Sequence, residues 1–537
     1  MMRKMRIIIE GGTGEACCES NLQMATTLSL LKSPYHLAPH IYETMDAGGK
    51  FIGNIQKLMA ANRALDFRNP DFRLLFLKVS DARKTKSNGQ EEPYNLRSVA
   101  DPWYHNQLLF TNDELDFDLT KGYGRNLKIG SFSCIHSLHR AMENSKDKLE
   151  GLQAIIDEVV NANNLYQVMV PYIAGGGGGE GRTNICKHPA LLRKMCIKAV
   201  MQDRHLTEEQ AIAYVERTLK IAVILIGSVF RFPRGGNLDQ DVSGLVAGTL
   251  ANYPEDSEKA VNAFYLLEHD AMPVQAEKFC DGSDDKYRHH HAIELLAFYA
   301  IQDFYEKSDE EMTVKGPYIA RYSSPGNGKT TWKTLALPDI VPKALGNRLF
   351  FDAMLIHWLK PQLLPAASGS GSLVNSTVFE SEFLGKLYGT KKSRELERAV
   401  SYEELEEQVL KPFSILLDRE LLFLEWLRDI CLTGKNWENG EMPTEDMKTE
   451  LFPVSEIEKL IRAATESNRP EPLSSFQLDR LTECNGKSLY YTRLTPDKIR
   501  TRMKYRDGRH PKPFSVLMEE LYDICADRKE KRHGFKS

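Results

Sequence analysis

The sequence predicts an α/β fold in which a parallel sheet is followed by a mainly helical C-terminal region. Short apolar runs repeatedly end in glycine-rich turns and continue as helical patterns, the order expected of strand–turn–helix units. One later segment, His291 to Tyr305, is apolar around most of its circumference, as is typical of a helix buried in the centre of a protein. From Glu382 to Cys431 the pattern is strongly helical.

The composition is that of a globular protein. The chain has 537 residues, of which 42% are apolar and 27% charged, enough for about two to four domains. A formal net charge of −4 argues against general nucleic-acid binding. No apolar run approaches the ~18 residues of a membrane span, and the one after Met5 is too short for a signal peptide. The nine cysteines form no C-x-x-C pair, which predicts a cytoplasmic protein without a disulfide framework or a zinc site.

The first strand–turn–helix unit lies at the N-terminus. Arg6 to Glu10 contains the apolar burst I-I-I, Gly11 to Gly14 reads G-G-T-G, and Asn21 to Leu31 has helical periodicity. This order is that of the first unit in a nucleotide-binding sheet. Gly12 and Gly14 match the first two glycines of the dinucleotide fingerprint, but Cys17 stands in place of the third.

Two further glycine-rich turns follow predicted strands. Leu115 to Leu119 leads into K-G-Y-G-R-N-L-K-I-G at Lys121 to Gly130, and Tyr166 to Ile173 leads into five glycines at Gly175 to Gly179. Glycine backbones can converge their N–H groups on an anion, and a following helix adds its positive dipole end. Because parallel strands end at one edge of a sheet, three such turns predict a phosphate site there. The alternative interpretation is three unrelated surface loops.

The remaining elements are predicted from periodicity alone. Strands are predicted at His40 to Thr44 and Lys220 to Phe230, with shorter strand fragments at Pro317 to Tyr322 and Thr331 to Ala336. Helices are predicted at Ser133 to Asn161, Arg193 to Thr218, Ser257 to Glu268, Val454 to Thr465 and Pro513 to Asp527. The loop Arg231 to Asn237 follows the clearest strand and is expected at the same edge as the glycines.

Taken together, these segments resemble the tubulin/FtsZ superfamily, and the chain would be a divergent, prokaryotic tubulin-like protein. The family signature is similar to G-G-G-T-G-[ST]-G, and Gly175 to Gly181 reads G-G-G-G-G-E-G. The preceding family loop, G-x-G-x-N-x-x-x-G, is matched by Gly122, Gly124, Asn126 and Gly130. An N-A pair like that of tubulins occurs at Asn262. The resemblance covers roughly residues 5 to 306.

The resemblance implies a GTP-binding protein, with Mg²⁺ accompanying the nucleotide, a long central helix and head-to-tail self-association. The glycine loops would hold the phosphates and Asn262 would contact the base. The implied nucleotide-binding residues are Gly11, Gly12, Gly14, Gly122, Gly124, Asn126, Gly175, Gly176, Gly177, Gly178, Gly179, Gly181 and Asn262. In polymerising members, acids after the central helix act on the neighbouring subunit's nucleotide, and here Asp303 and Glu306 occupy those positions. The implied reaction is weak or assembly-dependent GTP hydrolysis, and ATP stays open as the nucleotide.

Three departures from the family pattern keep other functions open. Gly178 replaces a threonine, Glu180 puts a carboxylate into the phosphate loop, and Ile301 replaces an asparagine. The first alternative is therefore a non-enzymatic scaffold with a degenerate nucleotide site. The second is an NAD-binding oxidoreductase that uses Gly12 and Gly14, with Asp46 as the acid for the ribose.

Two other motifs are interpreted as structural. Ser324 to Thr330 looks like the end of a phosphate-binding Walker loop, but Ser323 stands where glycine is required. His289, His290 and His291 lie close in sequence to three aspartates, yet the setting is that of a helix start, and no metal site is predicted. The resemblance leaves open whether one of these histidines contacts the base.

The predicted organisation has three parts. Residues 1–306 form the nucleotide-binding domain, residues 307–372 a connecting region with a small α/β remnant, and residues 373–537 a helical domain. In the last, Leu410, Phe413, Leu416 and their neighbours form an apolar stripe after an acidic cluster. We expect this stripe to pack on the rest of the chain, and a protein partner is the alternative.

Overall fold

The structure is a computed structural model of the full chain. It describes residues 2–30, 40–45, 52–65, 73–76, 95–99, 109–117, 119, 126, 128–132, 150–163, 165–176, 180–227, 230–231, 260–269, 274–275, 290–313, 317–324, 332–360, 406–431, 451–466 and 513–526. All structural statements below concern these residues.

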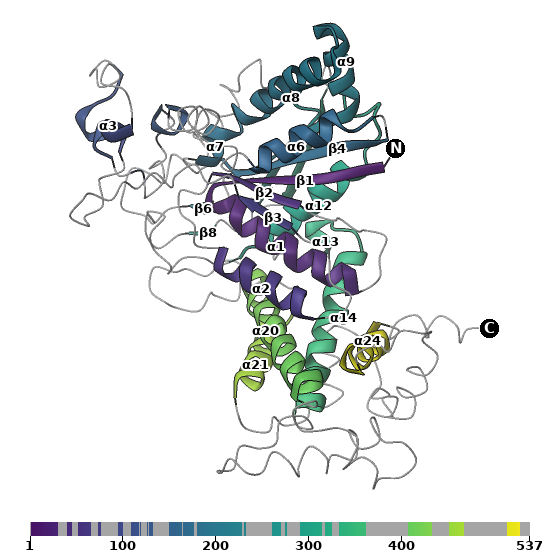
Figure 1. Cartoon of the computed structure of the whole chain (residues 1–537). Helices are drawn as coiled ribbons and strands as arrows, with labels where there is room; N and C mark the ends of the chain where they lie inside the picture. Colours follow the sequence, from purple (N-terminus) through teal and green to yellow (C-terminus); the bar gives the residue numbers. More distant parts are fainter. Residues whose placement is uncertain are drawn as a thin grey trace.

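A parallel sheet of seven strands organises the chain (Figure 1). The strand order is β3-β2-β1-β4-β5-β7-β9, and each neighbouring pair is parallel. The strands are β1 (Met2–Glu10), β2 (His40–Met45), β3 (Arg73–Phe76), β4 (Tyr166–Gly175), β5 (Leu219–Ile226), β7 (Ala263–His269) and β9 (Tyr318–Ser324). The α/β class and the parallel sheet are as predicted. A separate two-stranded sheet pairs β6 (Phe230–Arg231) with β8 (Val274–Gln275).

Helices cover both faces of this sheet (Figure 1). One face lies under α6 (Glu150–Val160), α8 (His188–Arg204) and α9 (Glu208–Thr218). The other face lies under α1 (Gly11–Leu30) and α12 (Ile293–Glu306), and α14 (Ile340–Met354) packs on α1. The central strands β1, β4 and β5 are buried on both faces. This double burial is why their sequences read as continuous apolar runs.

The helical C-terminal region packs onto the second face. Helix α20 (Lys411–Cys431) contacts α2 (Ile52–Ala64) and α21 (Val454–Thr465), and α24 (Pro513–Ala526) contacts α14. The predicted apolar stripe is buried there: Phe413, Leu416 and Leu424 belong to the same cluster as the side chains of α1 and α12. The stripe therefore packs on the rest of the chain, as expected. Shorter elements are α3 (Leu96–Val99), α4 (Asn112–Leu115), α7 (Glu180–Asn184), α13 (Trp332–Leu335) and the π-helical turns Leu355–Leu359 and Glu406–Leu410.

Several predicted elements are wrong. The predicted strand Leu115–Leu119 is absent, because Thr111 and Glu114 form a capping box that starts helix α4. The predicted helix Ser257–Glu268 contains strand β7 instead, since its A-F-Y-L-L run is buried between β5 and β9. The predicted strand fragment Thr331–Ala336 is helix α13.

Other boundaries differ from the prediction. The helix predicted over Arg193–Thr218 is two helices, separated at His205 with φ 53° and restarted by the capping box of Thr207 and Gln210. The first helix begins at Gly11 rather than at Asn21, so no glycine loop separates it from β1. The fragment predicted at Pro317 to Tyr322 is β9, which joins the main sheet as its edge strand.

Candidate functional site

The candidate site is the carboxyl edge of the sheet between β1 and β4, where the strand order reverses. From β1 the chain proceeds outward to β2 and β3, and from β4 it proceeds in the opposite direction to β5 and β7. In open α/β sheets such a switch point leaves a crevice in which ligands bind. Both β1 and β4 run directly into glycine-rich connections here.

The first connection, the β1–α1 step, consists of Gly11 alone. Gly11 has a φ of 70°, a conformation that favours glycine, and it turns the end of β1 straight into helix α1. The backbone N–H groups of this first helical turn have no partner within the helix and carry the positive end of its dipole. Gly11, Gly12 and Gly14 therefore lie together in the first turn of α1, at the carboxyl edge of the sheet.

The second connection, from β4 to α7, and the first, from β1 to α1, pack against each other's strands. A Cβ on Gly14, in α1, would lie 2.8 Å from the carbonyl oxygen of Ile173 in β4. A Cβ on Gly181, in α7, would lie 3.0 Å from the carbonyl oxygen of Glu10 in β1. Each connection thus packs against the other's strand at a distance that only glycine permits. This interlock brings two of the three predicted glycine turns to one place.

The rest of the second connection is partly described. Gly175 ends β4, and Gly176 donates its N–H to the carbonyl of Ile226 at 2.7 Å, which fixes the turn to β5. Gly177, Gly178 and Gly179 lie outside the described residues. Glu180 begins α7, but its side chain is not described. The neighbouring Arg182 is buried.

A buried polar cluster, which the sequence reasoning missed, joins the two connections. The carboxylate of Glu10, at the tip of β1, is fully buried. It accepts hydrogen bonds from Asn184 Nδ2 at 2.6 Å and pairs with His188 Nδ1 at 2.7 Å. A buried carboxylate requires such partners, because an uncompensated charge is costly in the interior. The available signal was Glu10 itself, an acid that directly follows the apolar run I-I-I at the end of β1.

One polar atom of this cluster is left without a hydrogen bond among the described residues. It is Oδ1 of the fully buried Asn184 side chain. Buried polar atoms are satisfied in most native structures, by protein, water or ligand. Asn184 Oδ1 is therefore able to accept a hydrogen bond from a bound molecule.

The thiol of Cys186, which follows α7, does not have the pKa of a nucleophile. Burial raises the pKa of Cys186 to about 11, although Lys187 and Arg182 act in the opposite direction. The thiol is consequently protonated near neutral pH, whereas nucleophilic cysteines have lowered pKa values. Among the described residues, no three His, Cys, Asp or Glu side chains are grouped so that they could hold a metal ion.

Most of the middle glycine turn cannot be followed in the part of the chain that the structure describes. Gly122 and Gly124 lie outside the described residues. Asn126 accepts from the backbone N–H groups of Lys128 and Ile129 and donates to Glu114 at 2.8 Å, so it is a helix cap. Partial burial acts to raise the pKa of Glu114, but hydrogen bonds from Lys128, Thr111 and Asn126 outweigh it and lower that pKa to about 2.

The predicted base-binding residue lies at the wrong edge. Asn262 precedes β7 at the amino edge of the sheet, where its side chain accepts from Arg193 at 2.7 Å and from the N–H of Ile221 at 2.9 Å, and donates to the carbonyl of Met312 at 3.2 Å. These bonds tie β5 to its neighbours and account for both polar atoms of the amide. The helix that would have carried Asn262 to the base does not exist, because β7 takes its place.

Asp303 and Glu306 also lie at the amino edge, at the end of α12. Asp303 accepts from the hydroxyl of Tyr265 at 3.0 Å and pairs with Lys307 at 3.4 Å. Arg3, at the start of β1, donates to the carbonyl of Tyr305. The two acids are therefore remote from the glycines of the same chain.

His290 and His291 are buried at the other end of α12. His290 Nδ1 lies 2.7 Å from Glu294, and its Nε2 lies 3.3 Å from Glu19. Burial acts to lower the pKa of His290, but the two carboxylates raise it well above its ordinary value. His289, the aspartates near it, and the Walker-like Ser324–Thr330 segment after Ser324 lie outside the described residues, as does Asp46.

Comparisons of the chain with protein-family models, with curated proteins and with solved structures find no match. In the part of the chain that the structure describes, no helix is both long enough and apolar enough to cross a bilayer. Assignment of a function therefore depends on the geometry of the crevice.

Proposed function

We propose that the protein binds a purine nucleotide, GTP with Mg²⁺, at the carboxyl edge of the sheet between β1 and β4. The observation that carries this proposal is the interlock of the two glycine connections, in which Gly14 packs on β4 and Gly181 packs on β1. Free backbone N–H groups, a helix dipole and a topological switch point coincide there. Phosphate is the ligand group that suits this combination.

The phosphates would lie over the first turn of α1 and against Gly175 and Gly176. The pairing of Glu10 with His188 and Asn184 supports this placement, since it compensates the one carboxylate that ends β1. Both oxygens of Glu10 are in contact with protein groups. Magnesium would therefore be held by phosphate oxygens and water, as is usual for nucleotide-bound Mg²⁺.

Kinship with the tubulin/FtsZ superfamily remains part of the proposal. It is supported by the order of the glycine turns and by α12, which is buried as a central helix would be. The position of Asp303 and Glu306 at the opposite edge suits a head-to-tail contact in which one subunit acts on its neighbour's nucleotide. The edge strand β9 and the helical C-terminal region would be additions specific to this chain.

Hydrolysis would consist of water attack on the γ-phosphate, with catalysis by positioning and charge stabilisation. If Asp303 and Glu306 act across a contact, phosphate release per subunit should rise with protein concentration. Glu306 is exposed, and Glu306→Gln should abolish that rise while GTP affinity is kept. The matched control is Glu310→Gln, another exposed acid four residues further on. Equal turnover in both variants would exclude a catalytic role for Glu306.

The test of binding is calorimetric titration of the protein with GTP, ATP and NAD in the presence of Mg²⁺. The diagnostic variant is Gly176→Asp, which adds a carboxylate at the end of β4. The control is Gly346→Ala in α14, where a Cβ would meet only the ring of Phe452 at 3.8 Å. GTP binding that Gly176→Asp abolishes and Gly346→Ala retains is the expected result. Absence of binding to any of the three would leave the scaffold alternative.

The second candidate is NAD binding. The specific observation in its favour is the strand order, which matches that of dinucleotide-binding sheets, together with the tight β1–α1 step at Gly11. Gly14 fills the role that the fingerprint gives to close packing of helix on strand. In the same titration, NAD binding without GTP binding would favour this candidate over the first.

A further inference from the structure

Helix α1 is buried from Ala16 to Leu28, yet many of these buried residues are polar. A buried helix is normally apolar around its circumference. Six polar side chains in this stretch are each at most 2% exposed: Glu19, Ser20, Asn21, Gln23, Thr26 and Thr27. Several of them bond to helices that occur more than 300 residues later in the chain.

Arg348 of α14 joins α1 to α20. Its Nη1 donates to Thr27 Oγ1 at 2.9 Å and to the carbonyl and side-chain oxygens of Gln23 at 3.3 Å. Its Nε donates to Glu420 of α20 at 2.8 Å, and its guanidinium lies 3.8 Å from the ring centroid of Phe423. One fully buried cation therefore spans three helices.

A second route runs from α20 through α2 back to α1. Arg419 pairs with Glu420 at 2.6 Å and donates to Asn62 of α2 at 3.2 Å. Asn62 in turn donates to Thr26 Oγ1 of α1 at 3.2 Å. Burial and the neighbouring Glu420 raise the pKa of Asp352 well above its ordinary value, and both arginines pair with the carboxylate of Glu420.

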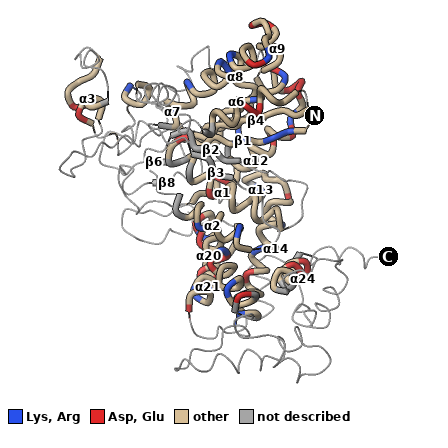
Figure 2. The backbone as a smooth tube through the Cα atoms, in the orientation of Figure 1, with Lys and Arg blue, Asp and Glu red and all other residues tan. Residues whose placement is uncertain are grey.

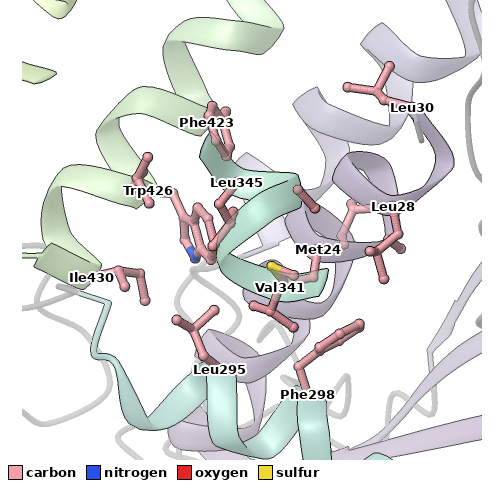
Figure 3. Close-up of a cluster of buried hydrophobic side chains, with 14 of the residues drawn as sticks. Met24, Leu28, Leu30, Leu295, Phe298, Val341, Leu345, Phe423, Trp426 and Ile430 are labelled. Atoms are coloured by element: carbon pink, nitrogen blue, oxygen red, sulfur yellow. The ribbon is translucent and has the colours of Figure 1, made fainter. Parts of the chain in front are cut away.

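A third contact lies nearer to the start of α1. The indole Nε1 of Trp426 donates to Ser20 Oγ at 2.7 Å, and Ser20 donates to Glu294 of α12. Apolar side chains of α1, α12, α14 and α20 fill the space between these contacts, among them Met24, Leu295, Val341 and Trp426 (Figure 3). The polar contacts are thus embedded in one continuous core.

These buried polar contacts are expected to fix the arrangement of the helices more than to stabilise the fold. A buried ion pair is frequently no more stabilising than apolar residues of the same volume, whereas it fixes the partners in one arrangement. Directional bonds at Ser20, Thr26 and Thr27 would be lost together if α1 shifted by one residue. The position of α1 and the position of α20 are therefore tightly coupled. The N-terminus of α1 is Gly11, at the candidate site.

We propose that α1 couples occupancy of the crevice to the docking of the helical region formed by α14 and α20. Resting on the proposed nucleotide site, this inference adds its regulation: phosphate held by the first turn of α1 fixes the helix, and the polar contacts fix α20. By linkage, loosening α20 weakens nucleotide binding by the same factor by which nucleotide tightens α20.

The experiment compares amide hydrogen exchange with and without GTP and Mg²⁺ in the full chain. The three reporters are the β1–α1 step, α20, and α9 on the opposite face of the sheet. We expect GTP to slow exchange at the step and in α20 by about 5-fold or more relative to α9, the lower end of usual coupling. Equal slowing in α9 and α20 would indicate global stabilisation and would overturn the inference.

The variant Arg348→Met should keep protection at the β1–α1 step and lose it in α20, and it should weaken GTP binding by a matching factor. Arg428→Met, in α20, where the arginine pairs with the adjacent Asp429 and is partly exposed, is the control and should behave as wild type. Should Arg348→Met fail to fold, Thr27→Val removes one of its contacts without changing volume and should act in the same direction. Protection at the step without any change in α20 would refute the coupling alone, whereas no protection anywhere would refute the nucleotide site as well.

Discussion

The face of the sheet under α6, α8 and α9 buries apolar side chains, and its charged groups lie toward its margins. Arg6 pairs with Glu158 of α6, Arg193 is held near the amino edge, and Glu10 lies at the carboxyl edge. The opposite face, under α1, α12, α14 and α20, holds Arg348, Arg419 and Glu420 in the middle of its core. Along the backbone, positions of Lys or Arg and of Asp or Glu occur in the helices on both sides of the sheet (Figure 2).

This difference teaches that the two faces obtain their structure by different means. Apolar packing supplies stability in proportion to the area buried and tolerates small shifts. A buried ionic network is specific but fails when any member is removed. We therefore expect substitutions in the α1 face to lower stability by removing buried hydrogen bonds and ion pairs. Substitutions of the glycines between β1 and β4 should lower it by steric overlap.

The largest effect is expected at Glu420. The variant Glu420→Leu leaves Arg348 and Arg419 buried without their carboxylate, which should lower the free energy of unfolding by about 3–5 kcal/mol. Urea denaturation at neutral pH measures it. The combined variant Glu420→Leu with both arginines changed to Met should recover most of the loss, because an apolar cluster replaces the charges. A loss below 1 kcal/mol for the single variant would show that the network is not a unit.

A smaller effect is expected at Gly14. In Gly14→Ala the new Cβ would lie 2.8 Å from the carbonyl oxygen of Ile173, so α1 must move away from β4. Overpacking of this kind costs about 1–3 kcal/mol. Gly181→Ala should behave similarly, and both should weaken nucleotide binding. Gly346→Ala is the control and should be neutral or slightly stabilising, since its Cβ has room within a helix.

Whether the sequence predicts a given element depends on whether the neighbours that decide its structure can be recognised from the sequence. Strands β1, β4 and β5 are predictable because burial on both faces leaves a continuous apolar run. Strand β7 is not, because A-F-Y-L-L fits a buried helix equally well, and only its neighbours β5 and β9 decide. The error at Asn262 follows directly from that ambiguity.

The candidate site shows the same limit. Glycines at strand ends predict an edge, and the structure brings Gly11, Gly14, Gly175 and Gly181 together there. The bond between Glu10 and Asn184 joins residues 174 positions apart, and that between Ser20 and Trp426 joins residues 406 apart. Hydrogen bonds between residues so far apart leave no periodicity or motif in the sequence. The polar contacts of α1 could therefore be found only from the structure.

The smallest and most selective effect concerns His290, which pairs with Glu19 of α1 and Glu294 of α12 on the α1 face. Its pKa is raised well above 6.5 in the folded protein, since Glu19 and Glu294 outweigh the opposing effect of burial. A raised pKa means that its contribution to stability is complete below pH 6.5 and is lost as the pH rises through the folded value. Burial raises the pKa of the Cys17 thiol, which lies near Glu294, well above its ordinary value. The thiol therefore keeps its proton near neutral pH.

We therefore expect the free energy of unfolding of the wild type to exceed that of His290→Gln most below pH 6.5, with the difference shrinking as the pH rises. Urea titrations from pH 6 to 9 measure it. His205→Gln, at the exposed junction between α8 and α9 on the other face, is the control and should give a nearly constant difference. If the His290 difference were also constant with pH, the imidazole would act by shape alone. The α1 face would then owe its specificity to the arginine cluster rather than to charge along the whole helix.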